Sequence, residues 1–193
     1  MKKYELTETT KEWLGITLYQ IRALRDIEEY DVEAGDLGGW IASEDNLDQD
    51  GNAWVFGNAQ VYGDAQVYGN AWVFGNAQVY GDARVYGDAR VSGDALVSGD
   101  AQVYGNARVS GNARVESRKH IFWASSVGSE DGTLTAYTIK TGEIEVTRGC
   151  FQGTIDEFEN AVKSRHGGSR HAEEYLILIQ YIRLRFRDVT VTT

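Results

Sequence analysis

The apolar positions of residues 51–116 recur with a fixed period of six. Eleven consecutive hexapeptides read glycine, Asn or Asp, alanine, any residue, valine, any residue, with alanine from Ala53 to Ala113 and valine from Val55 to Val115. Because side chains alternate across a strand, Ala and Val should line an interior, and the fourth and sixth places should face outward. Gly followed by Asn or Asp tolerates positive φ and predicts a turn. The pattern therefore predicts a four-residue strand and a two-residue corner in each hexapeptide.

The hexapeptides also form a longer repeat of eighteen residues. Residues 51–68, GNAWVFGNAQVYGDAQVY, and residues 69–86, GNAWVFGNAQVYGDARVY, differ only at Gln66 and Arg84. A hexapeptide period is typical of a parallel β-helix, and three hexapeptides would make one triangular coil. Residues eighteen apart would then stack about 4.8 Å apart. We expect a mainly β fold with about four coils, and we number its three faces from the hexapeptide that begins at Gly51.

The pattern A-x-V-x-G-[ND] resembles the hexapeptide repeat of left-handed β-helix proteins, the superfamily of trimeric hexapeptide acyltransferases. In that family the glycine usually follows the aliphatic residue directly, whereas here one residue intervenes. The resemblance implies a left-handed parallel β-helix and trimers with roughly parallel helix axes. The flanking segments, TLYQIRALRDI, AGDLGGWI and RGCFQGTIDEFENAVKSRHG, resemble uncharacterised phage and prophage proteins that carry GNAxVYG runs. This second resemblance implies a phage protein acting in the bacterial host cytoplasm.

The flanks predict caps, because the end coils of a solenoid expose unpaired strand edges. We expect an N-terminal β cap at 1–38, the hexapeptide-repeat β-helix at 39–122 and a C-terminal α+β domain at 123–193. Residues 14–27 predict one or two strands, and GWIASEDNLDQD keeps the frame loosely, with Leu47 in the alanine place. Ile121, in the valine place, would complete a fourth coil.

The C-terminal domain should contain strands followed by helices. FWASSVG, TLTAYTIKTG and EIEVTRGCF predict three antiparallel strands, the last two joined by a Thr-Gly turn. Thr154 opens a capping box, T-I-D-E, before a helix from about Ile155 to Arg165. A second helix, from about His171 to Arg187, is apolar on most sides and is expected in the cap or between subunits.

Composition and charge narrow the possible partners. The net charge is −10; residues 1–50 carry 13 acidic and 5 basic side chains, and no region is strongly basic. A duplex nucleic acid is therefore not an expected partner. The absence of proline suits continuous β pairing, and the single Cys150 fits a reducing compartment. Without a signal peptide or an apolar stretch of membrane-span length, a soluble cytoplasmic protein is expected.

Catalytic chemistry has little support in the sequence. An acyltransferase of this fold needs a histidine base in a cleft between subunits, yet the only histidines are His120, His166 and His171, and no loop interrupts the repeats. A zinc site of the γ-type carbonic anhydrase kind needs three histidines on the helix, where only His120 lies. No phosphate-binding loop or Ser/His/Asp signature is present, so no cofactor or metal is expected.

The outward columns carry the signal for function. The first face presents Trp and Phe in its early coils and Arg in its later ones, and the other faces present tyrosines. Stacking along the columns, packing between subunits, and a ligand or target surface are the three alternatives for so much outward aromatic area. The candidate binding or oligomer residues are Trp54, Phe56, Trp72, Phe74, Arg90 and Arg108 on the first face, Tyr62 and Tyr80 on the second, and Tyr68, Tyr86, Tyr104 and Arg84 on the third, whose column continues to Phe122.

The hypothesis that follows is a non-catalytic binding protein, encoded by a phage and directed at a host component. It would act in counter-defence, either by gripping a host protein or by sequestering a small nucleotide signal. Homo-oligomers, most simply trimers, are expected, with no membrane partner. An acyltransferase with an acyl-CoA donor is the alternative, and a structural particle component is a further one.

Overall fold

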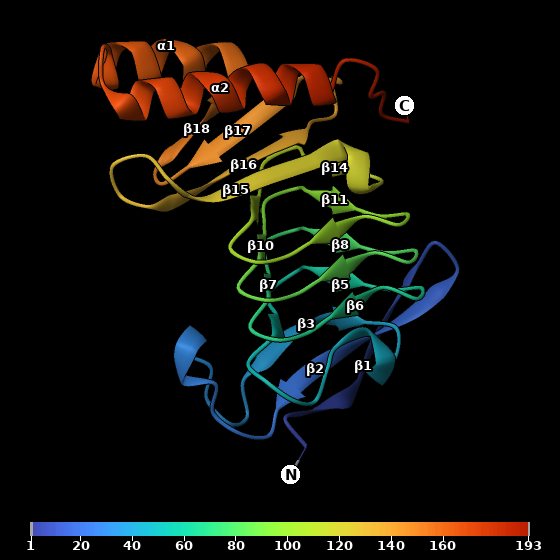
Figure 1. Ribbon diagram of the computed structural model, residues 1–193. Coiled ribbons are helices and arrows are strands. Elements are labelled where there is room, and N and C mark those ends of the chain that lie inside the picture. Colours follow the sequence, from blue (N-terminus) through green and yellow to red (C-terminus); the bar gives the residue numbers. More distant parts are fainter. Residues whose placement is uncertain (1, 193) are drawn as a thin grey trace.

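The computed structural model describes residues 2–192, and its centre is a parallel β-solenoid of about four coils between two caps (Figure 1). Each hexapeptide contributes one strand, and each strand has two residues rather than four, because only the fourth and fifth places pair with the next coil. The strands are β4(Trp54–Val55), β5(Gln60–Val61), β6(Gln66–Val67), β7(Trp72–Val73), β8(Gln78–Val79), β9(Arg84–Val85), β10(Arg90–Val91), β11(Leu96–Val97), β12(Gln102–Val103), β13(Arg108–Val109) and β14(Arg114–Val115).

The eighteen-residue coil is confirmed by the register of the three sheets. Trp54 pairs with Trp72 and Val61 with Val79, in parallel. The first face is β4-β7-β10-β13, the second β5-β8-β11-β14 and the third β6-β9-β12. Every repeat alanine and valine is fully buried or nearly so. The alternation of Ala and Val therefore builds the solenoid core, as the sequence predicts; the hand of the helix stays a prediction.

The corners depend on glycine for two reasons. Gly93 has φ +67°, a left-handed conformation that other residues adopt at a cost. In addition, a Cβ on Gly93 would lie 2.8 Å from the backbone nitrogen of Gly111, one coil further on. Corners of successive coils thus stack too closely for a side chain at this place.

The N-terminal cap is a β-hairpin that continues into the solenoid. Strands β1(Tyr4–Trp13) and β2(Ile16–Ala23) are antiparallel, and β3(Leu37–Ile41) pairs with β2 on one side and in parallel with β5 on the other. The expectation of one or two strands within 14–27 is confirmed by β2, whereas β1, which precedes the turn at Leu14, was not predicted. Between β2 and β3 lies the short 3₁₀ helix η1(Glu28–Tyr30).

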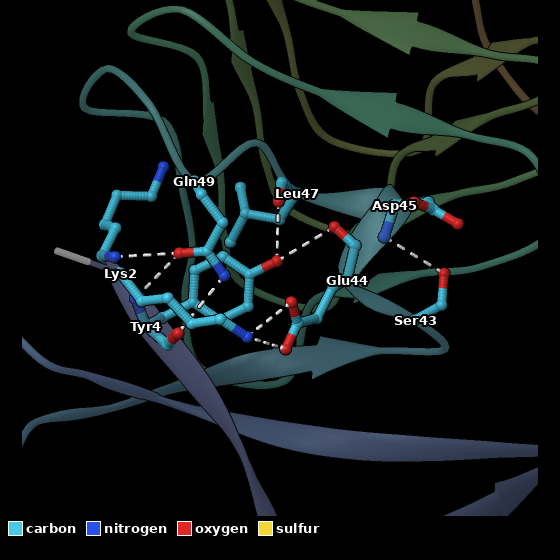
Figure 2. Close-up of polar contacts among 8 residues, drawn as sticks. Lys2, Tyr4, Ser43, Glu44, Asp45, Leu47 and Gln49 are labelled. Atoms are coloured by element: carbon cyan, nitrogen blue, oxygen red, sulfur yellow. Dashed lines mark hydrogen bonds and ion pairs between the residues drawn. The ribbon is translucent and has the colours of Figure 1, made fainter.

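The first coil is two residues longer than the others. Leu47, after the 3₁₀ helix η2(Glu44–Asn46), pairs with Val67, twenty positions on, so it occupies the valine place and not the predicted alanine place. The added length lies in the corner at 48–53, where the chain start inserts (Figure 2). There the Gln49 side-chain oxygen accepts from the Lys3 backbone N–H at 2.8 Å, and the Tyr4 hydroxyl donates to the Leu47 carbonyl at 2.6 Å. This corner closes the lower end of the core.

The C-terminal cap is a four-stranded antiparallel sheet covered by two helices (Figure 1). Its strands are β15(Ile121–Val127), β16(Gly132–Thr138), β17(Ile144–Arg148) and β18(Phe151–Thr154). The helices, α1(Ile155–His166) and α2(Arg170–Arg185), bury Phe158, Tyr175 and Ile182 against the sheet. The predicted capping box is confirmed, since Thr154 and Glu157 bond each other's backbone N–H. Among the described residues no helix has both the length and the apolar character to cross a membrane.

Two expectations for this region were wrong. The third predicted strand is divided into β17 and β18, because Gly149, at φ +59°, turns the chain there. Ile121 does not complete a fourth coil; after the 3₁₀ helix η3(Arg118–His120) it starts β15 and pairs with Tyr137 of β16. Its side chain still reaches the solenoid core.

Candidate binding groove

Trp54, expected on the outer surface, is buried. Its exposed fraction is 0%, because the N-terminal cap covers the first coil. The Tyr4 ring meets its indole edge-on, with centroids 6.3 Å apart, and Gly38 leaves no room for a Cβ beside it. Trp54 therefore closes the core and contributes nothing to an exposed surface.

The aromatic pair of the second face is also partly covered. Tyr62 stacks on Tyr80 with centroids 5.1 Å apart, as the column predicts, but it is only 5% exposed. The Trp13 side chain, at the end of β1, lies against the Tyr62 hydroxyl, and burial raises the pKa of this phenol. The first coil of the second face is thus covered by the hairpin of the chain itself.

The first face keeps an open aromatic floor one coil further up. Trp72 and Phe74 immediately precede and follow Val73 in the sequence, and their ring centroids are 4.6 Å apart. On the N-terminal side Tyr30 of η1 stacks on Trp72. Its hydroxyl donates to the Asn70 carbonyl, which fixes η1 against the coil, and burial raises the pKa of Tyr30 to about 12.

Two arginines continue this floor toward the C-terminal cap. Arg90 and Arg108 occupy the fourth place of the next two coils and pair in register. Both are exposed, and the guanidinium carbon of Arg90 lies 5.6 Å from the centroid of Trp72, within cation–π range. No ion pair among residues 2–192 uses either guanidinium.

The C-terminal sheet overhangs this floor and fixes its upper end. The Thr135 hydroxyl accepts from the Arg108 backbone N–H at 3.0 Å, and the Thr147 hydroxyl donates to the Arg108 carbonyl at 3.0 Å. Tyr137 contacts Ser110 at 3.1 Å and donates to Glu145 at 2.7 Å. Burial raises the pKa of Tyr137, and the neighbouring Glu145 raises it further, so the phenol stays neutral. The backbone of Arg108 is therefore rigid while its side chain remains free.

Floor and overhang enclose a hollow of about 220 Å³, which we call the first-face groove. Its overhang presents Gln152, whose amide donates to Glu145 at 2.9 Å, and the exposed Cys150. Three predicted residues, Phe74, Arg90 and Arg108, line the hollow itself, and Trp72 adjoins it. The cap residues were missed by sequence reasoning, because their contacts with the repeats follow no sequence period.

The remaining predicted residues lie elsewhere. Phe56 is exposed on the first coil. Tyr68, Tyr86 and Tyr104 form a stacked ladder on the third face, with successive centroids 4.8 Å apart, and Arg84 is exposed beside it. The ladder does not continue to Phe122 as predicted; Trp123 ends it, edge-on to Tyr104 at 4.3 Å.

His120 has a structural contact on each side of its ring. Its Nδ1 accepts from the Glu116 backbone N–H at 2.9 Å, so its Nε2 carries the proton and donates to the Thr190 carbonyl at 3.0 Å. The ring is 7% exposed. In the described chain no cluster of three or more His, Cys, Asp or Glu residues is placed to hold a metal ion.

The fold defines the class of the molecule: a capped parallel β-solenoid repeat protein. Its repeats are similar to the family described as "YdcK Beta solenoid repeat", which matches residues 59–74, 65–81, 77–91, 89–105 and 101–117. The similarity spans residues 59–117 and neither cap. No curated protein matches the chain.

Proposed function

We propose that this protein is a non-catalytic binding protein whose first-face groove holds a planar group next to an anionic one. The observation that carries the proposal is the row Trp72, Phe74, Arg90 and Arg108 on one face of a rigid solenoid. A planar group can pack against Phe74, which lines the hollow and is backed by Trp72, and an anion can bind the two guanidinium groups. In a chain of net charge −10, unpaired arginines in a hollow provide a local site for negative charge.

The size of the groove indicates how much of a ligand it covers. Pockets that enclose a whole small molecule usually measure about 300–1,000 Å³. A hollow of about 220 Å³ is smaller, so it holds part of a ligand. A base with its phosphate has the required chemistry, and so does an aromatic residue next to a carboxylate on a host protein. The floor is preorganised by the coils, so little conformational entropy is lost on binding.

Counter-defence is the role that we propose for this binding. The resemblance of the flanking segments to uncharacterised phage and prophage proteins supports it, because an accessory protein of a phage would act in the cytoplasm of its bacterial host. Acyl transfer is less well supported, because both ring nitrogens of His120 bond to backbone groups and this ring is not free to act as a base.

Native mass spectrometry on protein purified gently from bacterial cells, repeated after denaturation, tests the proposal. A nucleotide ligand would add a few hundred daltons that disappear on denaturation, whereas a host protein would appear as a larger complex. Either species should be lost in Arg108→Gln and retained in Arg84→Gln, which removes an exposed arginine from the third face. A bare chain or its oligomers alone, or equal retention in both variants, would overturn the groove as a binding site.

A further inference from the structure

The C-terminal cap contains a second hollow beside the turn that overhangs the first-face groove. It measures about 170 Å³, and residues 149–151 border both hollows. The β15–β16 loop and the C-terminal end of α1, which both line it, lie at the same end of the cap (Figure 1). We call it the cap pocket and define it by Arg148, Phe151, Phe158, Val162, Arg165 and Tyr175.

The walls of the cap pocket are mostly aromatic and belong to the core of the cap. The Phe158 ring lies between two others, with its centroid 5.2 Å from that of Phe151 and 5.4 Å from that of Tyr175. Phe158, Val162 and Tyr175 are each buried. These walls are therefore fixed by the packing of the cap, and they suit an aromatic ring or a branched aliphatic group.

Arg148 places a nearly buried guanidinium beside these apolar walls. Its side chain is 11% exposed, and its Nη2 donates to the Val127 carbonyl at 3.0 Å. A Cβ at position 132 would collide with the guanidinium, so Gly132 leaves the room for it. Its one ion pair in the described chain is with Glu130, which is 72% exposed and lies 3.9 Å from Nη1.

The charge of Arg148 is thus poorly compensated for a buried group. Its Nε is buried without a hydrogen-bond partner, and no hydrogen bond among residues 2–192 uses its Nη1. Arginine is almost never buried unless it is paired, because an uncompensated charge loses its hydration. A negatively charged group bound in the cap pocket would supply the missing partner.

A second cation lies at the border of the pocket. Arg165 is exposed and belongs to no ion pair of the described chain. Two arginines and one glutamate, Glu130, line the pocket, so its formal charge is +1 with His166 neutral. Glu174 reaches the β15–β16 loop but does not line the pocket, and it is paired with Arg170 at 3.0 Å. The local charge therefore favours a monoanion.

We propose that the cap pocket binds the carboxylate of a small apolar molecule. Nη1 of Arg148 and the guanidinium of Arg165 hold the carboxylate, whose planar shape matches an arginine fork. The apolar part of the molecule packs against Phe151 and Phe158. Pockets for whole small molecules measure about 300–1,000 Å³, so a hollow of about 170 Å³ admits one ring or one branched chain.

Two sources offer this chemistry: a free carboxylic acid and the C-terminal apolar residue of a peptide. Both present one carboxylate next to one apolar group. A phosphate suits the pocket less well, because a second negative charge would have no cation once Glu130 is counted. The inference does not rest on the first-face groove, whose arginines and phenylalanine are different residues.

An NMR titration of the isotope-labelled full chain with phenylacetate tests the proposal. The largest amide shifts should fall at Glu130 and Arg165, and not at Ser92 and Arg108 of the first-face groove. Phenylacetamide, which has the same shape without the charge, should bind at least about tenfold more weakly. Tighter binding of N-acetylphenylalanine than of phenylacetate would indicate a peptide C-terminus, and the reverse order a free acid.

Two charge variants separate ligand binding from simple anchoring of the loop by Arg148. Arg148→Gln should raise the dissociation constant of phenylacetate about tenfold or more, because the buried cation is lost. Glu130→Gln should lower it, because the carboxylate that competes for Nη1 is removed. A residue that only anchored the loop would give no such gain in affinity.

A third variant keeps both arginines and fills the pocket instead. Ala161→Phe places a ring in the hollow and should abolish binding, whereas Asn160→Phe, at the preceding exposed position of α1 outside the lining, should not. Failure of both acids to bind, shifts confined to the first-face groove, equal binding of phenylacetamide, or wild-type affinity in Arg148→Gln or Ala161→Phe would overturn the proposal.

Discussion

The ring of Tyr30 stacks on the indole of Trp72, with centroids 4.8 Å apart and planes 19° apart. This contact holds η1 at the lower border of the first-face groove. We expect Tyr30→Ala to free the segment 24–36 and to speed its cleavage in limited proteolysis, because the stacking and the bond to Asn70 are both lost. Tyr30→Phe, which keeps the stacking, should be cut at an intermediate rate. Equal rates for the wild type and Tyr30→Ala would show that the stacking does not hold η1.

Trp54 and Phe56 lie on the same coil but should respond very differently to truncation. Trp54→Ala removes a fully buried indole, and we expect a loss of about 3–5 kcal/mol in the free energy of unfolding. Phe56→Ala removes a ring that is 42% exposed, and the loss should be below about 1.5 kcal/mol. Urea denaturation of both variants measures the difference. Similar losses would contradict the burial of Trp54 by the cap.

A comparison of two corner glycines distinguishes the energetic cost of backbone strain from the cost of close contact between coils. Gly57 and Gly93 both have φ near +65°, but a Cβ on Gly57 would find its nearest coil neighbour at 3.9 Å, against 2.8 Å for Gly93. Gly57→Ala should therefore cost only the left-handed conformation, about 1–2 kcal/mol. Gly93→Ala should cost at least about 1 kcal/mol more, because the contact with Gly111 must also open. Thermal and urea unfolding of the two variants provide the comparison.

Stability should rise with pH above neutrality because of Lys3. Burial lowers the pKa of this amine from 10.5 to about 8, against the opposing effect of Asp48, while its Nζ donates to the Ala53 carbonyl at 2.8 Å. The folded chain therefore loses the proton before the unfolded chain does, and the penalty for the buried charge is relieved between about pH 8 and 10.5. From pH 7 to 9.5 this adds about 2 kcal/mol to the free energy of unfolding.

The control for this effect is Lys3→Met, which should abolish the rise in urea unfolding experiments at the two pH values. Measurements should stay below pH 10, because burial raises the pKa values of Tyr4 and Tyr137. For these phenols the sign is opposite: stability is lost as the pH rises above their ordinary value of 10.0. A wild type and Lys3→Met with the same pH dependence would show that Lys3 is not the group responsible.

The solenoid could be predicted from sequence because its contacts repeat. Val61 pairs with Val79, and Val79 pairs with Val97, because each pair is eighteen residues apart. A single sequence period is therefore enough to predict the whole solenoid core. The caps contain no such repetition. The strand at 4–13 was missed because most of its residues are polar and partly exposed, and the burial of Trp54 depends on Tyr4, fifty positions away.

The candidate groove was predictable only in part, for the same reason. Its floor follows the outward columns, which alternation assigns correctly for Trp72, Phe74, Arg90 and Arg108. Its borders come from η1 and from the turn at Cys150, whose positions depend on hydrogen bonds between caps and coils. Sequence periodicity gives the direction of a side chain, but not what a distant segment places over it.

Because the coils have a fixed spacing, the height of the first-face groove can change only in steps of one coil. Its lower border is attached to one coil through Tyr30, and its upper border to another through Thr135. Insertion or deletion of eighteen residues keeps every column in register, so it moves the two borders apart or together by about 4.8 Å and leaves each intact. A lineage carrying such a gene can therefore change the length of this groove in discrete steps, by unequal recombination between nearly identical blocks, without altering either border.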